Sequence, residues 1–148
     1  MEHNESREGL SVVIPAAGRL KLVESLLQSL QLSRSHFNTS CEVIVLDNSP
    51  EIDRPAMQTL AETYDALYRV GSDNLSEKRN QGIEQATYDI VLFLDSDCTV
   101  APDLLQQHYD RYQDANIAGC LGTLEFVGDD TLIWNAVKRT SVLACFDV

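Results

Sequence analysis

The sequence predicts an α/β fold of three layers, α/β/α, with a mostly parallel sheet in the middle. Apolar runs of strand length, such as residues 12–15 and 90–94, have the composition of strands that are buried on both faces of a sheet. Segments with apolar residues at helical spacing separate these runs, so strands and helices alternate along the chain. This alternation is typical of a parallel sheet with helices on both faces.

The composition limits the class of protein and its partners. The chain has 148 residues, which is enough for one domain with its own core. Its formal net charge of -12 argues against binding to nucleic acid or to an anionic membrane surface. No stretch reaches the ~18 apolar residues that a membrane span requires, and no cysteine belongs to a C-x-x-C pair, which favours reduced thiols. We therefore expect a cytoplasmic protein, either free or at the cytosolic face of a membrane.

The N-terminal part supplies two strands and the helix between them. Residues 1–9 are polar and are predicted to form a disordered tail. Residues 10–15 form the first predicted strand, and apolar residues at helical spacing predict a helix over residues 19–32. Small residues at positions 16–18 form the turn between them, where a ligand can approach the backbone. The second buried strand is predicted over residues 42–47, which end in a carboxylate.

The next segment continues the alternation. Pro55 marks the first turn of a helix predicted over residues 53–65, and residues 68–70 form a short third strand. A third helix is predicted to begin at Ser76, its N-cap, and to end at Ala86.

The C-terminal part begins with the fourth predicted strand, residues 89–94. A helix that starts at Pro102 follows it, then a fifth strand from residue 117 and a helix over residues 131–144.

Gly82 lies inside the helix predicted over residues 76–86, where a glycine costs ~1 kcal/mol relative to alanine. A packing or binding reason is therefore expected for this glycine.

Two carboxylates, Asp95 and Asp97, directly follow the fourth strand. The carboxyl ends of strands are where open α/β sheets bind ligands. Two carboxylates that lie close together repel each other unless a cation or strong donors compensate. Mg2+ or Mn2+, itself holding a phosphate, is the natural compensation. The alternative is that these residues cap the following helix, since aspartate is a favoured N-cap residue.

These carboxylates belong to a wider set of charged residues. The usual signatures of dinucleotide binding, of P-loops and of α/β-hydrolases are absent from the sequence. What remains is Asp47, Asp95 and Asp97 with the basic residues Lys78 and Arg79, a set that suits a nucleotide diphosphate held by a metal. Asp47 would accept hydrogen bonds from the base or ribose, Asp97 would bind the metal, and Arg79 would meet the charge at this edge. Alternatively, Arg79 lies on a solvated helix face.

The order of these segments resembles that of family 2 glycosyltransferases, which have the GT-A fold. The resemblance covers roughly residues 10–127 and includes the D-x-D motif of Asp95 and Asp97. It rests on segments in the family's order, namely residues 12–15, 43–49, 78–82 and 91–97, with further agreement at residues 103–105 and 117–119.

The resemblance implies an enzyme that transfers a sugar from a nucleotide-diphosphate-sugar donor to a hydroxyl group of a glycan, lipid or protein acceptor, with inversion at the anomeric carbon. It implies a divalent metal, Mg2+ or Mn2+, held by Asp97 with Asp95 and acting as a Lewis acid on the leaving diphosphate. The donor-binding residues that it implies are Pro15, Ala16, Ala17, Asp47, Arg79, Asn80, Asp95 and Ser96.

Two features depart from the family pattern. The turn at residues 16–19 is plainer than the polar turn that the family often has. The general base, an Asp or Glu that deprotonates the acceptor hydroxyl, is expected well after the D-x-D motif and beyond Val148. We therefore expect residues 10–148 to be a donor-binding portion that is incomplete at its C-terminus. A nucleotide-sugar-binding fragment without turnover is the first alternative.

A haloacid-dehalogenase-like phosphatase is a second alternative, because residues 95–100 also fit the D-x-D-x-[TV] signature of that class. In that class the motif belongs on the first core strand, whereas here three predicted strands precede it.

Overall fold

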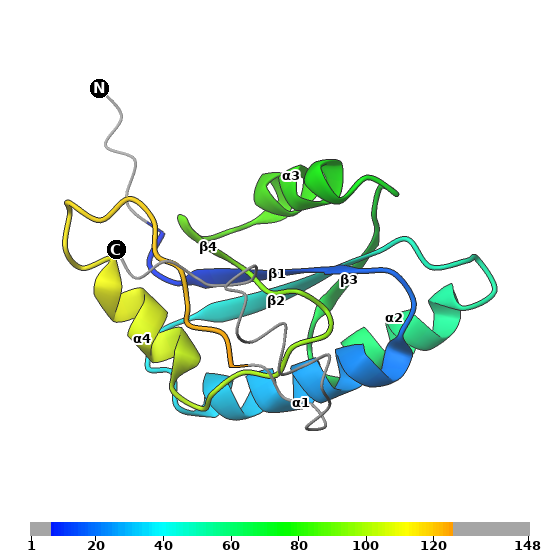
Figure 1. Cartoon of the computed structure of the whole chain (residues 1–148), viewed down its shortest axis with the longest axis horizontal. Helices are drawn as coiled ribbons and strands as arrows, with labels where there is room; N and C mark the ends of the chain where they lie inside the picture. Colours follow the sequence, from blue (N-terminus) through cyan, green and yellow to red (C-terminus); the bar gives the residue numbers. More distant parts are fainter. Residues whose placement is uncertain (1–6, 126–148) are drawn as a thin grey trace, which may run out of the picture. The chain divides into compact units, whose positions relative to one another are not determined.

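A parallel sheet lies at the centre of residues 7–125, the part of the chain that the computed structural model describes (Figure 1). The strands occur in the order β3-β2-β1-β4, and every neighbouring pair is parallel. A helix lies between each strand and the next, as expected. The elements are β1 (Leu10–Ala16), α1 (Leu20–Ser35), β2 (Cys41–Asp47), α2 (Arg54–Thr63), β3 (Leu67–Val70), α3 (Leu75–Gln85), β4 (Ile90–Phe93) and α4 (Leu104–Arg111).

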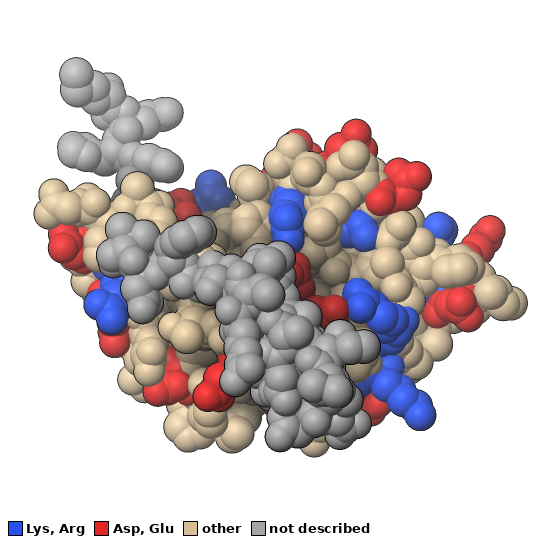
Figure 2. Space-filling view, viewed as in Figure 1, with Lys and Arg blue, Asp and Glu red and all other residues tan. Residues whose placement is uncertain are grey.

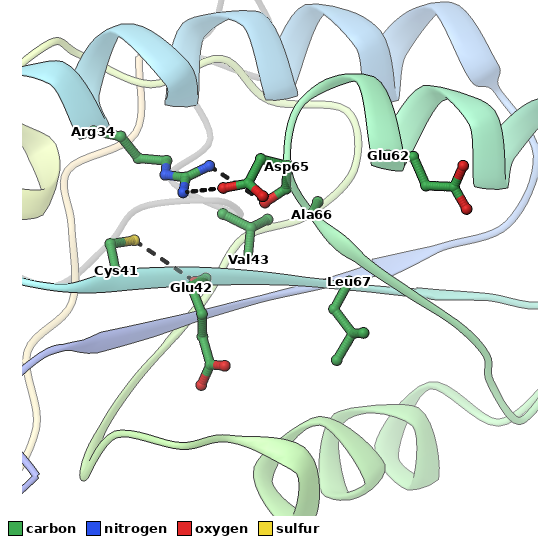
Figure 3. Close-up of a pocket in the computed structure, with 8 residues that line it drawn as sticks. All are labelled: Arg34, Cys41, Glu42, Val43, Glu62, Asp65, Ala66 and Leu67. Atoms are coloured by element: carbon green, nitrogen blue, oxygen red, sulfur yellow. Dashed lines mark hydrogen bonds and ion pairs between the residues drawn. The ribbon is translucent and has the colours of Figure 1, made fainter.

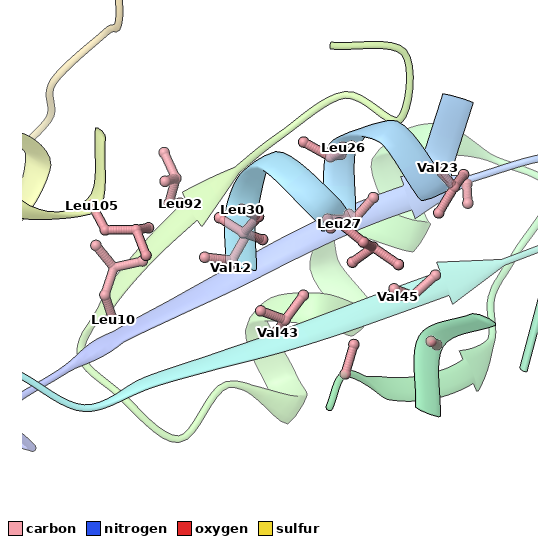
Figure 4. Close-up of a cluster of buried hydrophobic side chains, with 14 of the residues drawn as sticks. Leu10, Val12, Val23, Leu26, Leu27, Leu30, Val43, Val45, Leu92 and Leu105 are labelled. Atoms are coloured by element: carbon pink, nitrogen blue, oxygen red, sulfur yellow. The ribbon is translucent and has the colours of Figure 1, made fainter. Parts of the chain in front are cut away.

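Helices cover both faces of this sheet, which confirms the three-layer prediction. In Figure 1, α3 lies on one side of the sheet and α1, α2 and α4 lie on the other. Successive side chains of β1 and β2 alternate between the two layers, as the pleat requires. On the side of α3, Val13, Ile44 and Leu46 form a buried cluster. The larger cluster, on the side of α1, includes Val12, Val43, Val45, Leu26, Leu27 and Leu30 (Figure 4).

Gly82 allows α3 to pack closely on the sheet. A Cβ atom at this position would overlap the side chain of Val13 and lie 3.1 Å from Leu46 Cδ1. A larger residue would push the helix away from the buried cluster. The expected packing reason for a glycine inside a helix is therefore confirmed.

The start of α3 differs from the prediction. Its N-cap is Asn74 rather than Ser76, and the Asn74 side chain accepts hydrogen bonds from the backbone N–H groups of Ser76 (2.9 Å) and Glu77 (3.1 Å). Both residue types are favoured N-caps. The side-chain oxygen of Asn74 accepts hydrogen bonds from two backbone N–H groups that have no partner within the helix. Ser76 supplies one of these N–H groups and is therefore a donor to the cap, not the cap itself.

Residues 7–9 were expected to belong to a disordered tail, but they pack against the chain. The Arg7 backbone N–H donates to the carboxylate of Asp89 (3.1 Å), and its guanidinium donates to the carbonyl of Thr87 (3.2 Å). Gly9 is buried, with no room for a side chain because the ring of Tyr88 lies over it. These long-range contacts give order that polar composition cannot predict. Residues 1–6 of the expected tail lie outside the described residues.

The chain divides into two compact units, residues 1–113 and residues 114–148. All of the helices and strands named above belong to the first unit. The second unit is described only over residues 114–125. The expectation that residues 10–148 form a single domain stays a prediction, and the predicted helix over residues 131–144 lies outside the described residues.

The predicted strand from residue 117 is wrong over the described residues 117–125, which contain no strand. The segment begins with a turn instead, because the Asp114 carbonyl accepts from the backbone N–H of Ile117 (3.0 Å) and its carboxylate accepts from Asn116. The two hydrogen bonds from Asn116 lower the pKa of the Asp114 carboxyl. Glycines at positions 119 and 122 interrupt the apolar run, and glycine weakens strands.

Charges of both signs lie next to one another on the face shown in Figure 2. Among residues 7–125, no helix combines the length and the apolar character that crossing a membrane requires.

Candidate functional site

Three loops meet at the carboxyl edge of the sheet, where they follow β1, β2 and β4. The strand register brings them together, since Ala16 lies opposite Asp47 and the Leu94 N–H donates to the carbonyl of Val13 (3.1 Å). From β1 the chain runs outward through β2 and β3, and then returns to the other side of β1 as β4. This reversal is a topological switch point, the position at which open α/β sheets bind ligands.

Asp47, the last residue of β2, organises the loop that follows it. The residue is fully buried, with 0% of its surface exposed. Its Oδ1 accepts from the backbone N–H (3.0 Å) and the hydroxyl (2.5 Å) of Ser49, and its Oδ2 accepts from the Tyr68 hydroxyl (3.2 Å). Burial and then the charge of Asp47 raise the pKa of Tyr68, so the phenol keeps the proton that it donates. A ligand could reach this carboxylate only if Ser49 or Tyr68 moved.

Lys78 reaches from α3 to the ends of β1 and β2. Only 4% of its surface is exposed, and its ammonium donates to the Ala16 carbonyl (2.8 Å) and to Asn48 Oδ1 (2.6 Å). Burial lowers the pKa of Lys78, and the negative charges of Asp47 and Asp73 oppose that shift. The lysine therefore holds two loops together instead of presenting its charge at the surface.

The turn between β1 and α1 has a left-handed backbone at two consecutive residues. Gly18 has a φ of 65° and Arg19 a φ of 54°. Glycine adopts this conformation freely, whereas it is uncommon for a residue with a Cβ. The Gly18 N–H donates to the hydroxyl oxygen of Ser49 (2.7 Å), so the loop after β2 supports the turn after β1.

Each carboxylate of the D-x-D motif is paired with an arginine from another element. Arg79 Nη2, on α3, lies 3.1 Å from Asp95 Oδ1, and Arg19 Nη1 lies 3.0 Å from Asp97 Oδ2. The next helix, α4, has Asp103 at its N-cap, so neither aspartate caps it. The capping alternative is therefore wrong, and strong donors compensate the two charges, which is one of the two compensations expected from the sequence.

Arg79 has an environment that a solvated helix face does not provide. Its guanidinium carbon lies 6.0 Å from the centroid of the Phe93 ring, within the range of a cation–π contact. Its Nε atom is buried and has no hydrogen-bond partner among the described residues. Buried donors are rarely left unpaired in proteins, and a bound water or ion can be the partner of such a group. The Arg79 side chain is nevertheless 37% exposed, so the residue is partly solvated while it contacts Asp95 and Phe93.

The remaining predicted residues divide into buried and accessible ones. Pro15, Ala16 and Ser96 are buried at the strand ends, and Ser96 exposes only 3% of its surface. Ala17 and Asn80 are exposed. The first group shapes the edge from within, and the second can meet a ligand directly.

Three residues of this site were not singled out for it from the sequence. Arg19 had a positional signal, because it is a basic residue in the turn after a predicted strand. Ser49 had a weaker one, since an aspartate followed two residues later by serine is a common turn pattern. Tyr68 had none, because its contact with Asp47 spans 21 residues of sequence.

Comparison with known proteins identifies the family. The profile of glycosyl transferase family 2 matches residues 11–146. This chain belongs to glycosyl transferase family 2. The phosphatase alternative is left without support, because the D-x-D motif follows β4 and not the first strand.

Several known proteins are similar to this chain. The uncharacterized glycosyltransferase YfnE of Bacillus subtilis (strain 168) is 30% identical over 118 residues, which cover 74% of this chain and 29% of YfnE. The mannosyltransferase PcManGT of Pyrobaculum calidifontis, solved with GDP-Man and Mn2+, has a TM-score of 0.60 at 22% identity, covering 86% of this chain and 38% of that one. Residues 1–349 of TarS from S. aureus, solved with UDP-GlcNAc, have a TM-score of 0.56 at 22% identity, covering 71% and 32%. The chain thus spans well under half of each of these proteins.

The D-x-D carboxylates of this family 2 chain fit a hard divalent cation. Among residues 7–125, no three His, Cys, Asp or Glu side chains form a metal site by themselves. Mg2+ is usually held by one or two carboxylates and completes its shell with water and substrate phosphates. Asp95 and Asp97, whose side chains are 68% and 50% exposed, offer that partial set.

A separate cavity of about 440 Å3 lies at the opposite, amino-terminal ends of β2 and β3 (Figure 3). The Arg34–Asp65 ion pair (3.0 Å) lies on its wall beside Cys41. Burial raises the pKa of Cys41 to about 11, so its thiol stays protonated. Because this cavity is remote from the switch point, we assign it no part in the family 2 site.

Proposed function

We propose that this chain is the donor-binding part of a glycosyltransferase. It would bind a nucleotide-diphosphate sugar, with Mg2+ or Mn2+, for transfer of the sugar to an acceptor hydroxyl with inversion. The observation that carries this proposal is the group of two carboxylates and two guanidinium groups at the switch point, Asp95 with Arg79 and Asp97 with Arg19. Opposite charges of this kind suit a ligand that combines a divalent cation with a diphosphate.

The metal would be held by Asp97 with Asp95. When bound, it would supply Lewis-acid stabilisation of the charge that develops on the leaving nucleoside diphosphate. The carboxylate oxygens of this chain are hard ligands of the type that Mg2+ and Mn2+ prefer. Both side chains are accessible enough for a metal to enter.

The donor would lie between α3 and the loop after β1. The accessible part of the Arg79 guanidinium, on a side chain that is 37% exposed, would donate to a phosphate oxygen or to a base carbonyl. Asn80, exposed beside it, would line the same pocket. The small residues Ala16 and Ala17 would let the donor approach the backbone. Pro15 and Ser96 would shape the edge beneath it.

Asp47 would act on the donor mainly through its neighbours. The direct contact with base or ribose that the resemblance implies requires Ser49 or Tyr68 to move, since Asp47 is fully buried. With both partners in place, the carboxylate instead fixes the two loops that border the donor.

A nucleotide-sugar-binding fragment without turnover is the second candidate, because the chain covers only 29% of YfnE. The general base and the acceptor site, for a glycan, lipid or protein, would then lie in the remainder of a longer protein. Release of nucleoside diphosphate from a donor sugar separates the two candidates, since the fragment would bind but not release it.

A thermal-shift panel of UDP, GDP and dTDP, each with and without Mn2+, tests the donor site. A nucleotide at 100 times its Kd should stabilise the chain by ~2.7 kcal/mol. We expect one nucleotide to stabilise in a metal-dependent way, and Asp97→Asn to abolish that effect.

The matched control is Asp65→Asn, which removes an arginine ion pair of the same length (3.0 Å) far from the site. It should leave the nucleotide effect unchanged. Stabilisation of Asp97→Asn equal to that of the wild type would contradict the metal assignment, and no stabilisation of the wild type by any of the three would contradict the donor site.

A further inference from the structure

Arg19 contacts the carboxylate that the proposed function assigns to the metal. Its Nη1 lies 3.0 Å from Asp97 Oδ2, and its Nη2 lies 3.5 Å from Ser96 Oγ. The pair spans 78 residues of sequence and joins the loop after β1 to the loop after β4. The guanidinium group of Arg19 therefore occupies the position at which a metal cation would bind Asp97.

The orientation of Arg19 is set by the loops around it. The residue has a left-handed backbone, with a φ of 54°, which residues with a side chain seldom adopt unless their surroundings hold them there. The backbone N–H of the preceding Gly18 donates a hydrogen bond to Ser49 Oγ, and the Ser49 hydroxyl donates in turn to the buried carboxylate of Asp47. A backbone held in an uncommon conformation, next to a ligand-binding edge, is characteristic of functional positions.

The ion pair itself is easily broken. The side chains of Arg19 and Asp97 are 54% and 50% exposed, so water screens their attraction strongly. The backbone of Arg19 is thus fixed, whereas its guanidinium can exchange one anionic partner for another at little cost.

We propose, on the basis of the donor site proposed above, that Arg19 is a ligand-positioning residue that changes partner. Without metal, its guanidinium neutralises Asp97. When a divalent cation is bound at Asp97, Arg19 releases the carboxylate and donates to the diphosphate oxygens of the donor. A planar guanidinium can donate two parallel hydrogen bonds to a phosphate, so the new partner is at least as favourable as the old one.

This exchange predicts effects of opposite sign on two ligands. Loss of Arg19 removes a competitor for Asp97, which should strengthen the binding of Mn2+ alone. Two unit charges 4 Å apart interact by ~1 kcal/mol in water, which corresponds to about a fivefold change in affinity. The same loss removes a hydrogen-bond donor to the diphosphate, which should weaken nucleotide binding in saturating Mn2+ by about tenfold or more.

The test measures both affinities on the 148-residue chain. Free Mn2+ is followed by electron paramagnetic resonance in a titration without nucleotide, and UDP, GDP and dTDP are titrated calorimetrically in saturating Mn2+. The variants are Arg19→Asn, since asparagine tolerates a left-handed backbone, and Arg19→Lys, which keeps the charge. The matched control is Lys21→Gln, which removes one positive charge from an exposed position in the first turn of α1. Melting temperatures without ligand check that every variant is folded.

The proposal expects Arg19→Asn to bind Mn2+ about fivefold tighter and the nucleotide about tenfold weaker, with Arg19→Lys between it and the wild type and Lys21→Gln within twofold of the wild type. Unchanged or weaker Mn2+ binding by Arg19→Asn would overturn the competition. Unchanged nucleotide binding would overturn the transfer to the diphosphate. If the wild type binds neither ligand, the proposed function itself fails, which is a different result from either of these.

Discussion

The buried ammonium of Lys78 offers a quantitative test of how the site is held together. Lys78→Met keeps an unbranched side chain of similar length, so it fills the same space without the charge. It removes the donor of two hydrogen bonds, to the Ala16 carbonyl (2.8 Å) and to Asn48 Oδ1 (2.6 Å). Hydrogen bonds to charged groups contribute ~1.5–3 kcal/mol each.

The substitution also removes an unfavourable contribution, because only 4% of the surface of Lys78 is exposed and its ammonium has lost hydration. This desolvation is the cause of the lowered pKa of Lys78. Asn48 is partly exposed, so water can replace part of its lost bond. We therefore expect Lys78→Met to lower the free energy of unfolding by ~2–4 kcal/mol, below the sum of the two hydrogen bonds.

Urea unfolding of Lys78→Met and of the control Lys21→Met measures this difference. Lys21 is exposed, so its substitution should change the free energy of unfolding by less than ~0.5 kcal/mol. Equal effects of the two substitutions would refute the reasoning, because they would show that the Lys78 ammonium does not hold the ends of β1 and β2. Lys78→Met should also weaken nucleotide binding, since both loops border the proposed donor site.

Two further predictions concern α3 and α4. Gly82→Ala should destabilise the chain by ~1–2 kcal/mol in urea unfolding, because overlap with Val13 outweighs the ~1 kcal/mol gain in helix propensity; a net stabilisation would contradict the close packing. Burial lowers the pKa of His108 below its ordinary 6.5, so the unfolded chain binds the proton first and stability should fall as the pH drops below 6.5. Between pH 6.5 and 5, the free energy of unfolding of His108→Gln should fall less steeply than that of the wild type. The same slope in both proteins would contradict the lowered pKa of His108.

Much of the fold could be predicted from the sequence because the signals are local. The runs at residues 12–15 and 43–46 are apolar throughout, as is typical of strands buried on both faces, and they lie within β1 and β2. Helical spacing predicted α1, and Pro55 near the start of a helix predicted α2. Errors arose where two local signals compete or where order depends on distant contacts, as at the N-cap of α3 and at residues 7–9.

The sequence by itself determined the family, through motifs whose order survives in the linear chain, and it determined which strand ends carry the charged residues. Only the tertiary structure decided how those residues are used. Asp47 is enclosed by Ser49 and Tyr68, and Asp97 is paired with Arg19. These partners depend on which loops the strand order 3-2-1-4 brings to one edge. A contact between residues 78 positions apart leaves no periodic or compositional trace, because it is set by register and packing rather than by local propensity.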